Sequence, residues 1–217
     1  MKYKLLFALT LTFSLLNGYS FEKINPSPSK KMLENQLKAQ TCTSPVMASE
    51  TISEDFKYGC FCGKNYPITD NNKTKDFRKL KKNERIKLIE TFYSIKPYDD
   101  IDKICMQHDI CYLYKGKKSK ACNRAIYSEL KSLSKEFKVH NELKKNRQCK
   151  YLSNDIASVF RTIFASSDDK MNMLEFGSLM FNTSITIAQK TVEKSFETVT
   201  QQDQRYPPKE ERCLILK

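Results

Sequence analysis

The eight cysteines are the feature that most constrains what this 217-residue chain can fold into. An even cysteine count in an exported chain favours a disulfide framework of up to four bridges. Eight cysteines allow about 105 complete pairings, so the count leaves the connectivity open. A zinc cluster is the alternative, but C-x-C followed by C-x2-H-x2-C differs from the paired C-x2-C of structural zinc sites. The positions are Cys42, Cys60, Cys62, Cys105, Cys111, Cys122, Cys149 and Cys213.

Residues 1–20 are predicted to be an export signal. Two lysines precede the apolar run at 5–16, and small residues up to Ser20 suit cleavage before Phe21. The run is too short to favour the alternative of an N-terminal membrane anchor, and no later stretch approaches the ~20 apolar residues of a spanning helix. We therefore expect a secreted protein, extracellular or, in a bacterium, periplasmic.

The formal net charge is +13 at pH 7. A basic exported protein suits an anionic membrane, a polyanionic glycan or nucleic acid, or the charge serves solubility alone. Because no recognisable nucleic-acid module accompanies the charge, we expect no nucleic-acid partner. We favour a phospholipid membrane surface with anionic head groups as the partner. The sequence leaves the oligomeric state open.

Beyond the signal, the chain divides into three parts by composition. Residues 21–41 form a polar leader of uncertain order. The cysteine-rich domain covers 42–150 and includes a basic segment at 70–95. Residues 151–217 read as a helical C-terminal extension, to which we assign no chemistry.

Two helices are predicted within the cysteine-rich domain, over 96–116 and 119–139. A proline and two aspartates mark the start of the first helix, and a glycine marks its end. The short turn between the helices makes them antiparallel neighbours. Cys111 and Cys122 are then well placed to form a bridge.

Apolar periodicity predicts further helices over 76–95, 153–166 and 171–199. The first of these carries many basic residues around its apolar positions. It suits a helix lying at a membrane interface, and it equally suits a solvated excursion packed on the core.

The segment YGCFCG at 58–63 contains two of the five glycines in the chain. Glycine adopts unusual backbone angles without steric cost, as a loop with inward carbonyls requires. Calcium takes about six to eight oxygens, often backbone carbonyls together with carboxylate. Asp109 supplies such a carboxylate, and the adjacent His108 points about 100° away around the same helix.

This combination suits hydrolysis. A histidine takes a proton from water while a cation polarises the carbonyl under attack, so no serine, cysteine or threonine nucleophile is needed. The alternative is a packed helix histidine beside a solvated carboxylate. A glycine loop together with a His-Asp pair on a helix favours catalysis.

The two stretches resemble secreted phospholipase A2. That family has a loop of YGCYCGxGG type followed by P-x-D-x-x-D-x-C-C-x-x-H-D-x-C-Y, and this chain has YGCFCGKNYP and PYDDIDKICMQHDICY. The match covers roughly 58–65 and 97–127. It implies a mainly α fold in which a disulfide-linked pair of antiparallel helices accompanies a calcium-binding loop, with additional helices.

The resemblance implies a calcium site and a hydrolytic reaction. The backbone carbonyls of Phe61, Gly63 and Asn65 and the carboxylate of Asp109 would bind calcium. His108 would be the general base that activates water against the sn-2 ester of a glycerophospholipid, releasing a fatty acid.

Three further implications concern neighbouring groups. The Gly63 N–H would steady the oxyanion. Tyr112 and Asn123 occupy positions of the hydrogen-bond network at the family's catalytic site. The implied disulfides are Cys62–Cys105, Cys111–Cys122, and Cys60 with Cys149 or Cys213.

The chain departs from the family pattern at four places. Ile104 replaces a cysteine, which removes one usual disulfide. Asn123 stands where the family has an aspartate, so we expect retained but weakened catalysis. Asn65 and Tyr66 replace a glycine pair, and the long basic segment separates the loop from Pro97.

Two other functions stay open. One is a catalytically silent relative that binds a membrane or a receptor, which the neutral Asn123 favours and the presence of His108 and Asp109 disfavours. The other is a disulfide-stapled structural or adhesion module, which accounts for the cysteines and the charge but not for the histidine motif.

Overall fold

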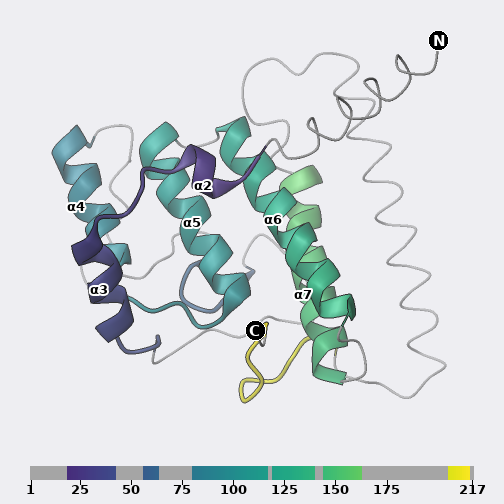
Figure 1. Ribbon diagram of the computed structural model, residues 1–217. Coiled ribbons are helices and arrows are strands. Elements are labelled where there is room, and N and C mark those ends of the chain that lie inside the picture. Colours follow the sequence, from purple (N-terminus) through teal and green to yellow (C-terminus); the bar gives the residue numbers. More distant parts are fainter. Residues whose placement is uncertain are drawn as a thin grey trace, which may run out of the picture.

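The computed structural model describes residues 19–42, 56–63, 80–116, 119–139, 144–162 and 205–215. These parts are mainly helical and carry four disulfides, as Figure 1 and the bond geometry show. The expected mainly α, disulfide-rich fold is therefore confirmed. Almost all of the predicted signal, Asn65 and the helix predicted over 171–199 lie outside the described residues. Within them, no helix combines the length and apolar content needed to cross a bilayer.

Helices α5 (Asp100–Lys115) and α6 (Lys120–Val139) are the expected pair. The side chain of Asp99 caps α5 by accepting the N–H of Asp102, and Gly116 ends it with a φ of 107°. The Cys111–Cys122 disulfide ties the end of α5 to the start of α6. Residues of α5 therefore face residues of α6 in antiparallel order.

Helix α7 (Lys144–Thr162) runs antiparallel along α6. Ser153 Oγ donates to the carbonyl of Leu130 at 2.7 Å, and Lys131 Nζ donates to Asn154 Oδ1 at 2.8 Å. The sequence predicts this helix to begin only at 153, because residues 144–150 are too polar to show apolar periodicity. The expected boundary after residue 150 falls inside α7.

Helices α2 (Phe21–Ile24) and α3 (Lys30–Lys38) occupy the predicted leader. Phe21 is 2% exposed, and its backbone N–H donates to Glu129 Oε1 on α6 at 2.7 Å. Asn25 Nδ2 donates to the carbonyl of Gln107 on α5 at 2.9 Å. This segment is therefore part of the fold, which its polar composition does not reveal.

Helix α4 (Lys82–Phe92) lies within the helix predicted over 76–95. Its buried residues are Ile89 and Phe92, and the Phe92 ring packs edge-on against Phe61 with centroids 5.7 Å apart. In the described part of the basic segment, Ile89 and Phe92 therefore pack on the core, whereas Ile86 is 42% exposed.

Strands β1 (Lys57–Tyr58) and β2 (Cys62–Gly63) form a small antiparallel hairpin. Lys57 pairs with Gly63, and Tyr58 pairs with Cys62. The hairpin holds the glycine-containing loop at 58–63 beside α5.

All eight cysteines form disulfides, which leaves no thiolate for zinc. The Cys62–Cys105 and Cys111–Cys122 bridges are those that the resemblance implies. The expected bridge from Cys60 to a C-terminal cysteine is wrong. Cys60 pairs with Cys42, and Cys149 pairs with Cys213. The N–H of Cys42 donates to the carbonyl of Lys96 at 3.0 Å, which holds residue 42 beside the segment that leads into α5.

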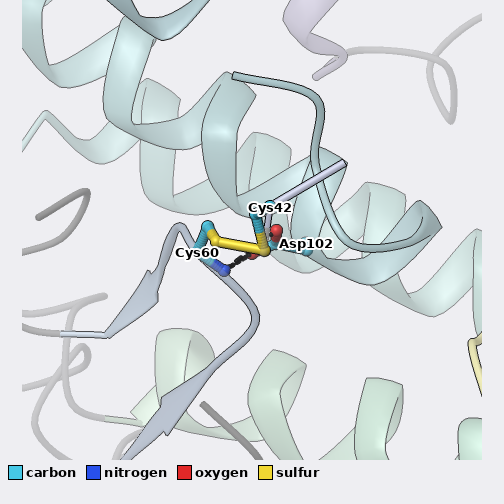
Figure 2. Close-up of side chains that lie close together, drawn as sticks. All are labelled: Cys42, Cys60 and Asp102. Atoms are coloured by element: carbon cyan, nitrogen blue, oxygen red, sulfur yellow. Dashed lines mark hydrogen bonds between the residues drawn. A yellow bond between two sulfur atoms is a disulfide. The ribbon is translucent and has the colours of Figure 1, made fainter. Parts of the chain in front are cut away.

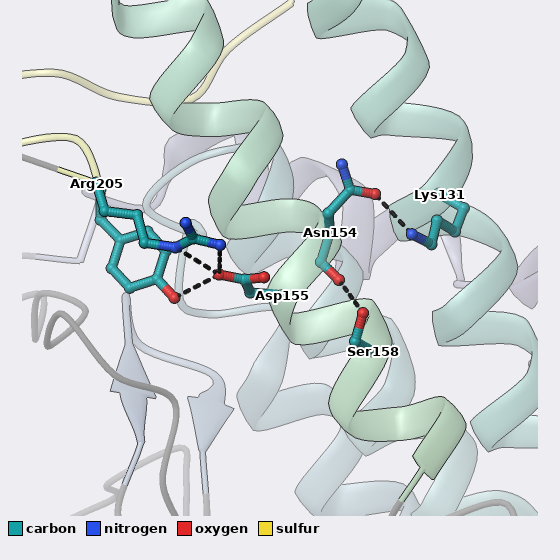
Figure 3. Close-up of polar contacts among 6 residues, drawn as sticks. Lys131, Asn154, Asp155, Ser158 and Arg205 are labelled. Atoms are coloured by element: carbon teal, nitrogen blue, oxygen red, sulfur yellow. Dashed lines mark hydrogen bonds and ion pairs between the residues drawn. The ribbon is translucent and has the colours of Figure 1, made fainter. Parts of the chain in front are cut away.

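The C-terminal segment, residues 205–215, docks on α7 and on the start of α5. Figure 3 shows the α7 contact, where Arg205 reaches Asp155 Oδ2 at 2.9 Å. Tyr206 Oη donates to the same oxygen at 2.8 Å. At the other end, the N–H of Cys213 donates to Asp99 Oδ2 at 3.0 Å. The segment therefore connects two helices that are distant in sequence.

Candidate active site

His108 lies on α5, facing Asn123 on α6. Its Nε2 is 3.1 Å from Asn123 Oδ1, and the hydroxyl of Tyr112 donates to that same oxygen. A carbonyl oxygen only accepts hydrogen bonds, so Nε2 carries the proton in the neutral ring. The lone pair of Nδ1 is then the basic site, and Asn123 sets the tautomer.

His108 is only 5% exposed, and three aromatic rings lie near its imidazole. The ring centroids of Tyr112, Phe160 and Phe21 lie 4.1, 4.7 and 6.3 Å from its own. Burial lowers the pKa of His108 to about 4, and the hydrogen bond to Asn123 opposes this in part. The ring is therefore neutral at physiological pH, as a general base must be.

The carboxylate of Asp102 attaches the loop to α5. It accepts the backbone N–H of Cys60 at 3.0 Å, of Phe61 at 2.8 Å and of Tyr98 at 2.9 Å. Burial raises the pKa of Asp102, and these backbone donors counteract the rise by favouring the charged form. The histidine motif contains Asp102, but the sequence does not show that its carboxylate binds the loop backbone. The D-x-x-D spacing before the histidine is the signal that marks the residue.

Asp102 also explains a glycine. A Cβ at Gly59 would lie 2.4 Å from Asp102 Cγ, and the φ of Gly59 is +61°. Space and backbone angle therefore both require glycine there. At Gly63, where φ is +137°, a Cβ would lie 2.7 Å from the carbonyl oxygen of Phe56. The expectation that the loop needs its glycines is consistent with these contacts.

Asp109 follows His108 and is half-buried. Its Oδ2 is shielded from solvent and accepts no hydrogen bond within the described part of the chain. Burial raises its pKa well above the usual range, and the negative charge of Asp102 adds to the effect. A buried carboxylate oxygen without a donor is costly, and a cation is one partner that removes this cost.

The backbone carbonyls of Phe61 and Gly63 and the carboxylate of Asp109 are oxygen ligands of the kind that calcium takes. Cys62–Cys105 joins the loop that carries Phe61 and Gly63 to the helix that carries Asp109. The expected fourth residue, Asn65, lies outside the described residues.

One other group of potential metal ligands lies close together among the described residues, namely Cys42, Cys60 and Asp102. Figure 2 shows that the two sulfurs form a disulfide and that Asp102 binds the loop backbone. Since the sulfurs are oxidised and the carboxylate is occupied, this group is structural.

The structure brings together His108, Tyr112 and Asn123, and Asp109 follows His108 on α5. Sequence reasoning missed Phe21 and Phe160, which lie in the segments to which it assigned no chemistry.

Comparison with protein-family models, with curated proteins and with solved structures gave no match. The functional interpretation therefore rests on the residues of the site.

Proposed function

We propose that this protein is a carboxylic ester hydrolase that cleaves the sn-2 ester of glycerophospholipids with calcium as cofactor. The products are a fatty acid and a lysophospholipid. The observation that carries the proposal concerns two neighbouring residues. Asn123 fixes the tautomer of His108, and the buried Oδ2 of Asp109 accepts no hydrogen bond from the described residues. The first group suits proton abstraction, and the second suits a hard cation.

In this proposal, His108 Nδ1 takes the proton of an attacking water molecule. The ring then carries a positive charge, and its Nε2–H donates to Asn123 Oδ1. The hydroxyl of Tyr112 also donates to Oδ1 and so holds this oxygen in place. The N–H of Gly63 donates to the oxyanion that develops on the ester carbonyl.

Bound calcium would polarise the ester carbonyl and offset the negative charge of the oxyanion. The residues that would hold it are Asp109 through its carboxylate and Phe61, Gly63 and Asn65 through their backbone carbonyls. Asp102 supports this set indirectly, because it fixes the backbone at Phe61.

Asn123 limits the rate in this proposal. Its amide oxygen orients His108 but brings no negative charge to stabilise the imidazolium. Burial already disfavours the charged ring. We therefore infer a weak hydrolase.

An anionic phospholipid surface is the proposed partner. On α3, Leu37 is 80% exposed and Leu33 is 45% exposed, and Lys30, Lys31 and Lys38 flank them. On α4, Ile86 is 42% exposed. Exposed apolar side chains among lysines suit insertion between anionic head groups.

Fatty-acid release from phospholipid vesicles, with calcium or with a chelator, tests the proposal. We expect calcium-dependent release by the wild type and a loss of at least 100-fold in His108→Gln, which keeps a polar side chain but removes the base. The matched control is His140→Gln, because His140 is the other histidine of the chain. Equal activity of the two variants, or release that persists in the chelator, would contradict the proposal.

A catalytically silent membrane-binding protein is the second candidate. The nearly complete enclosure of His108 and the neutral Asn123 favour it. It predicts that anionic vesicles bind the wild type and His108→Gln equally and that neither protein releases fatty acid.

A further inference from the structure

Among the described residues, burial begins at Phe21, the residue before which the sequence predicts cleavage of the export signal. Tyr19 is 42% exposed, whereas Phe21 is 2% exposed. The ring of Phe21 meets the imidazole of His108 edge-on, with centroids 6.3 Å apart. The predicted cleavage site therefore coincides with the first buried side chain of the described residues.

The backbone nitrogen of Phe21 faces a carboxylate on another helix. Its N–H donates to Glu129 Oε1 on α6 at 2.7 Å, and Glu129 is half-buried. Burial raises the pKa of Glu129. The N–H of Phe21 and the charge of Lys103 on α5 oppose the rise, and the charge of Glu22 adds to it. A positive charge at the position of the Phe21 nitrogen would therefore stabilise this carboxylate.

We propose that hydrolysis of the Ser20–Phe21 bond turns this nitrogen into an α-ammonium group and that Glu129 is the docking site for the new N-terminus. A signal-type peptidase would catalyse the step. As the C–N bond breaks, the oxygen of one water molecule goes to the carbonyl carbon of Ser20, which leaves as a carboxylate. The two protons of that water end on the nitrogen of Phe21. The proposal does not rest on the hydrolase function.

Cleavage changes the charge of the donor but leaves its partner in place. The Phe21 nitrogen already lies 2.7 Å from the carboxylate oxygen, and a hydrogen bond between two ionised groups is roughly twice as strong as a neutral one. The macrodipole of a long helix would oppose a cation at its start. Helix α2 has only 4 residues and carries Glu22 in its first turn, so this opposition is small.

Cleavage also removes contacts that residues 19 and 20 make. The carbonyl of Ser20 accepts the N–H of Lys23 at 3.2 Å, and the hydroxyl of Tyr19 accepts Arg124 Nη1 at 2.8 Å. The Tyr19 contact is exposed to solvent. The buried ring of Phe21 and its contact with the carboxylate lie on the retained side of the bond, so the packing of α2 is kept after cleavage.

The first experiment locates the cleavage. The full chain is expressed with its own residues 1–20 in a secreting host, and the N-terminus of the product is read by intact-mass and peptide mass spectrometry. We expect a mature chain that begins at Phe21. A product that begins at another residue, or one that keeps residues 1–20, overturns the processing site.

The second experiment measures the charge of the Phe21 nitrogen. Protein that begins at Phe21 is made by removing an N-terminal fusion partner and is labelled with acetic anhydride, which reacts with unprotonated amines. Pairing with Glu129 should hold the α-amino pKa above its ordinary value of about 7.7–8.0. In Glu129→Gln, which keeps the size of the side chain but removes its charge, Phe21 should be labelled at least fivefold faster at about pH 7, relative to the lysines of the same protein.

Glu136→Gln is the matched control, because Glu136 is an exposed glutamate on the same helix. Its labelling rate at Phe21 should equal that of the wild type. Equal rates in Glu129→Gln and Glu136→Gln overturn the docking site. If Glu129→Gln does not fold, Glu129→Asp replaces it. This variant withdraws the carboxylate by one methylene group and should raise the rate at least twofold, and an unchanged rate overturns the docking site.

Discussion

Two regions of the molecule use a buried carboxylate as an anchor, but they use it differently. In the loop unit, residues 58–63 with α5, Asp102 accepts three backbone N–H groups. In the C-terminal unit, α7 with residues 205–215, Asp155 accepts the side chains of Arg205 and Tyr206. Figures 2 and 3 show the two anchors.

The difference concerns what each unit tolerates. Backbone donors exist at every residue except proline, so the loop anchor depends on backbone path and on the absence of a Cβ at Gly59. The C-terminal anchor depends on particular side chains. The loop unit should therefore be sensitive to backbone changes and essential for chemistry, whereas the C-terminal unit should brace the fold.

The largest effect should come from removing one disulfide from each unit. By the chain-entropy model, Cys149→Ser/Cys213→Ser and Cys62→Ser/Cys105→Ser should each lose about 4 kcal/mol of unfolding free energy. Their sequence separations, 64 and 43, differ too little to separate them. Urea unfolding measures these losses.

The two disulfide variants should differ in hydrolytic activity when it is measured at urea concentrations at which both are still folded. The loop variant should lose calcium-dependent hydrolysis, because the covalent bond between its loop and the helix of Asp109 is gone and only the hydrogen bonds to Asp102 remain. The C-terminal variant should retain it. Equal losses of activity would remove the distinction between the two units.

Glycine substitutions sharpen the comparison at single residues. Gly59→Ala should lose roughly 3 kcal/mol of stability for two reasons. The added Cβ would clash with Asp102, and the backbone of residue 59 has a positive φ, which alanine disfavours. Gly116→Ala should lose roughly 1–2 kcal/mol, because φ is +107° but, beyond the chain neighbours, no atom of the described residues lies within 4 Å of the added Cβ. Thermal unfolding measures both, and equal losses would show that Asp102 moves aside freely.

The sequence also predicts the local structure of the loop unit well, except for the partner of Cys60, because the signals for that structure lie close together in sequence. Helix signals at Asp99 and Gly116 and the spacing of the histidine motif are local, so they can be read without the fold. The contacts of Phe21 and Phe160 with His108, and the Cys149–Cys213 bridge, join segments far apart in sequence. No local pattern reports such contacts, which is why they emerge only in three dimensions. The Cys42–Cys60 bridge spans 18 residues, and it accompanies the contact between residues 42 and 96.

Asp99 lies where the two units meet and provides a pH-dependent test. Its carboxylate accepts the hydroxyl of Tyr58 in the loop unit and the N–H of Cys213 in the C-terminal segment. Burial raises its pKa from 3.8 to about 6. Between these values the unfolded chain releases its proton before the native protein does, so rising pH favours unfolding.

The Asp99 contribution should therefore be fully present below about pH 4 and lost by about pH 6, a change of up to about 3 kcal/mol. Asp99→Asn does not titrate, so its unfolding free energy should lack this decline across the window. Asp100→Asn, which alters the neighbouring carboxylate that accepts the N–H of Ile215, should keep it. Urea unfolding at several pH values measures the slopes, and identical slopes in wild type and Asp99→Asn would contradict the assignment.

The smallest predicted effect, about tenfold in kcat/KM, comes from Asn123→Asp. A carboxylate would still accept from His108 Nε2 and Tyr112, and its charge would stabilise the imidazolium that forms during proton abstraction. Fatty-acid release by the wild type and by Asn123→Asp, measured with calcium, gives the size of the gain. An unchanged kcat/KM in folded Asn123→Asp would mean that the charge at residue 123 does not govern catalysis.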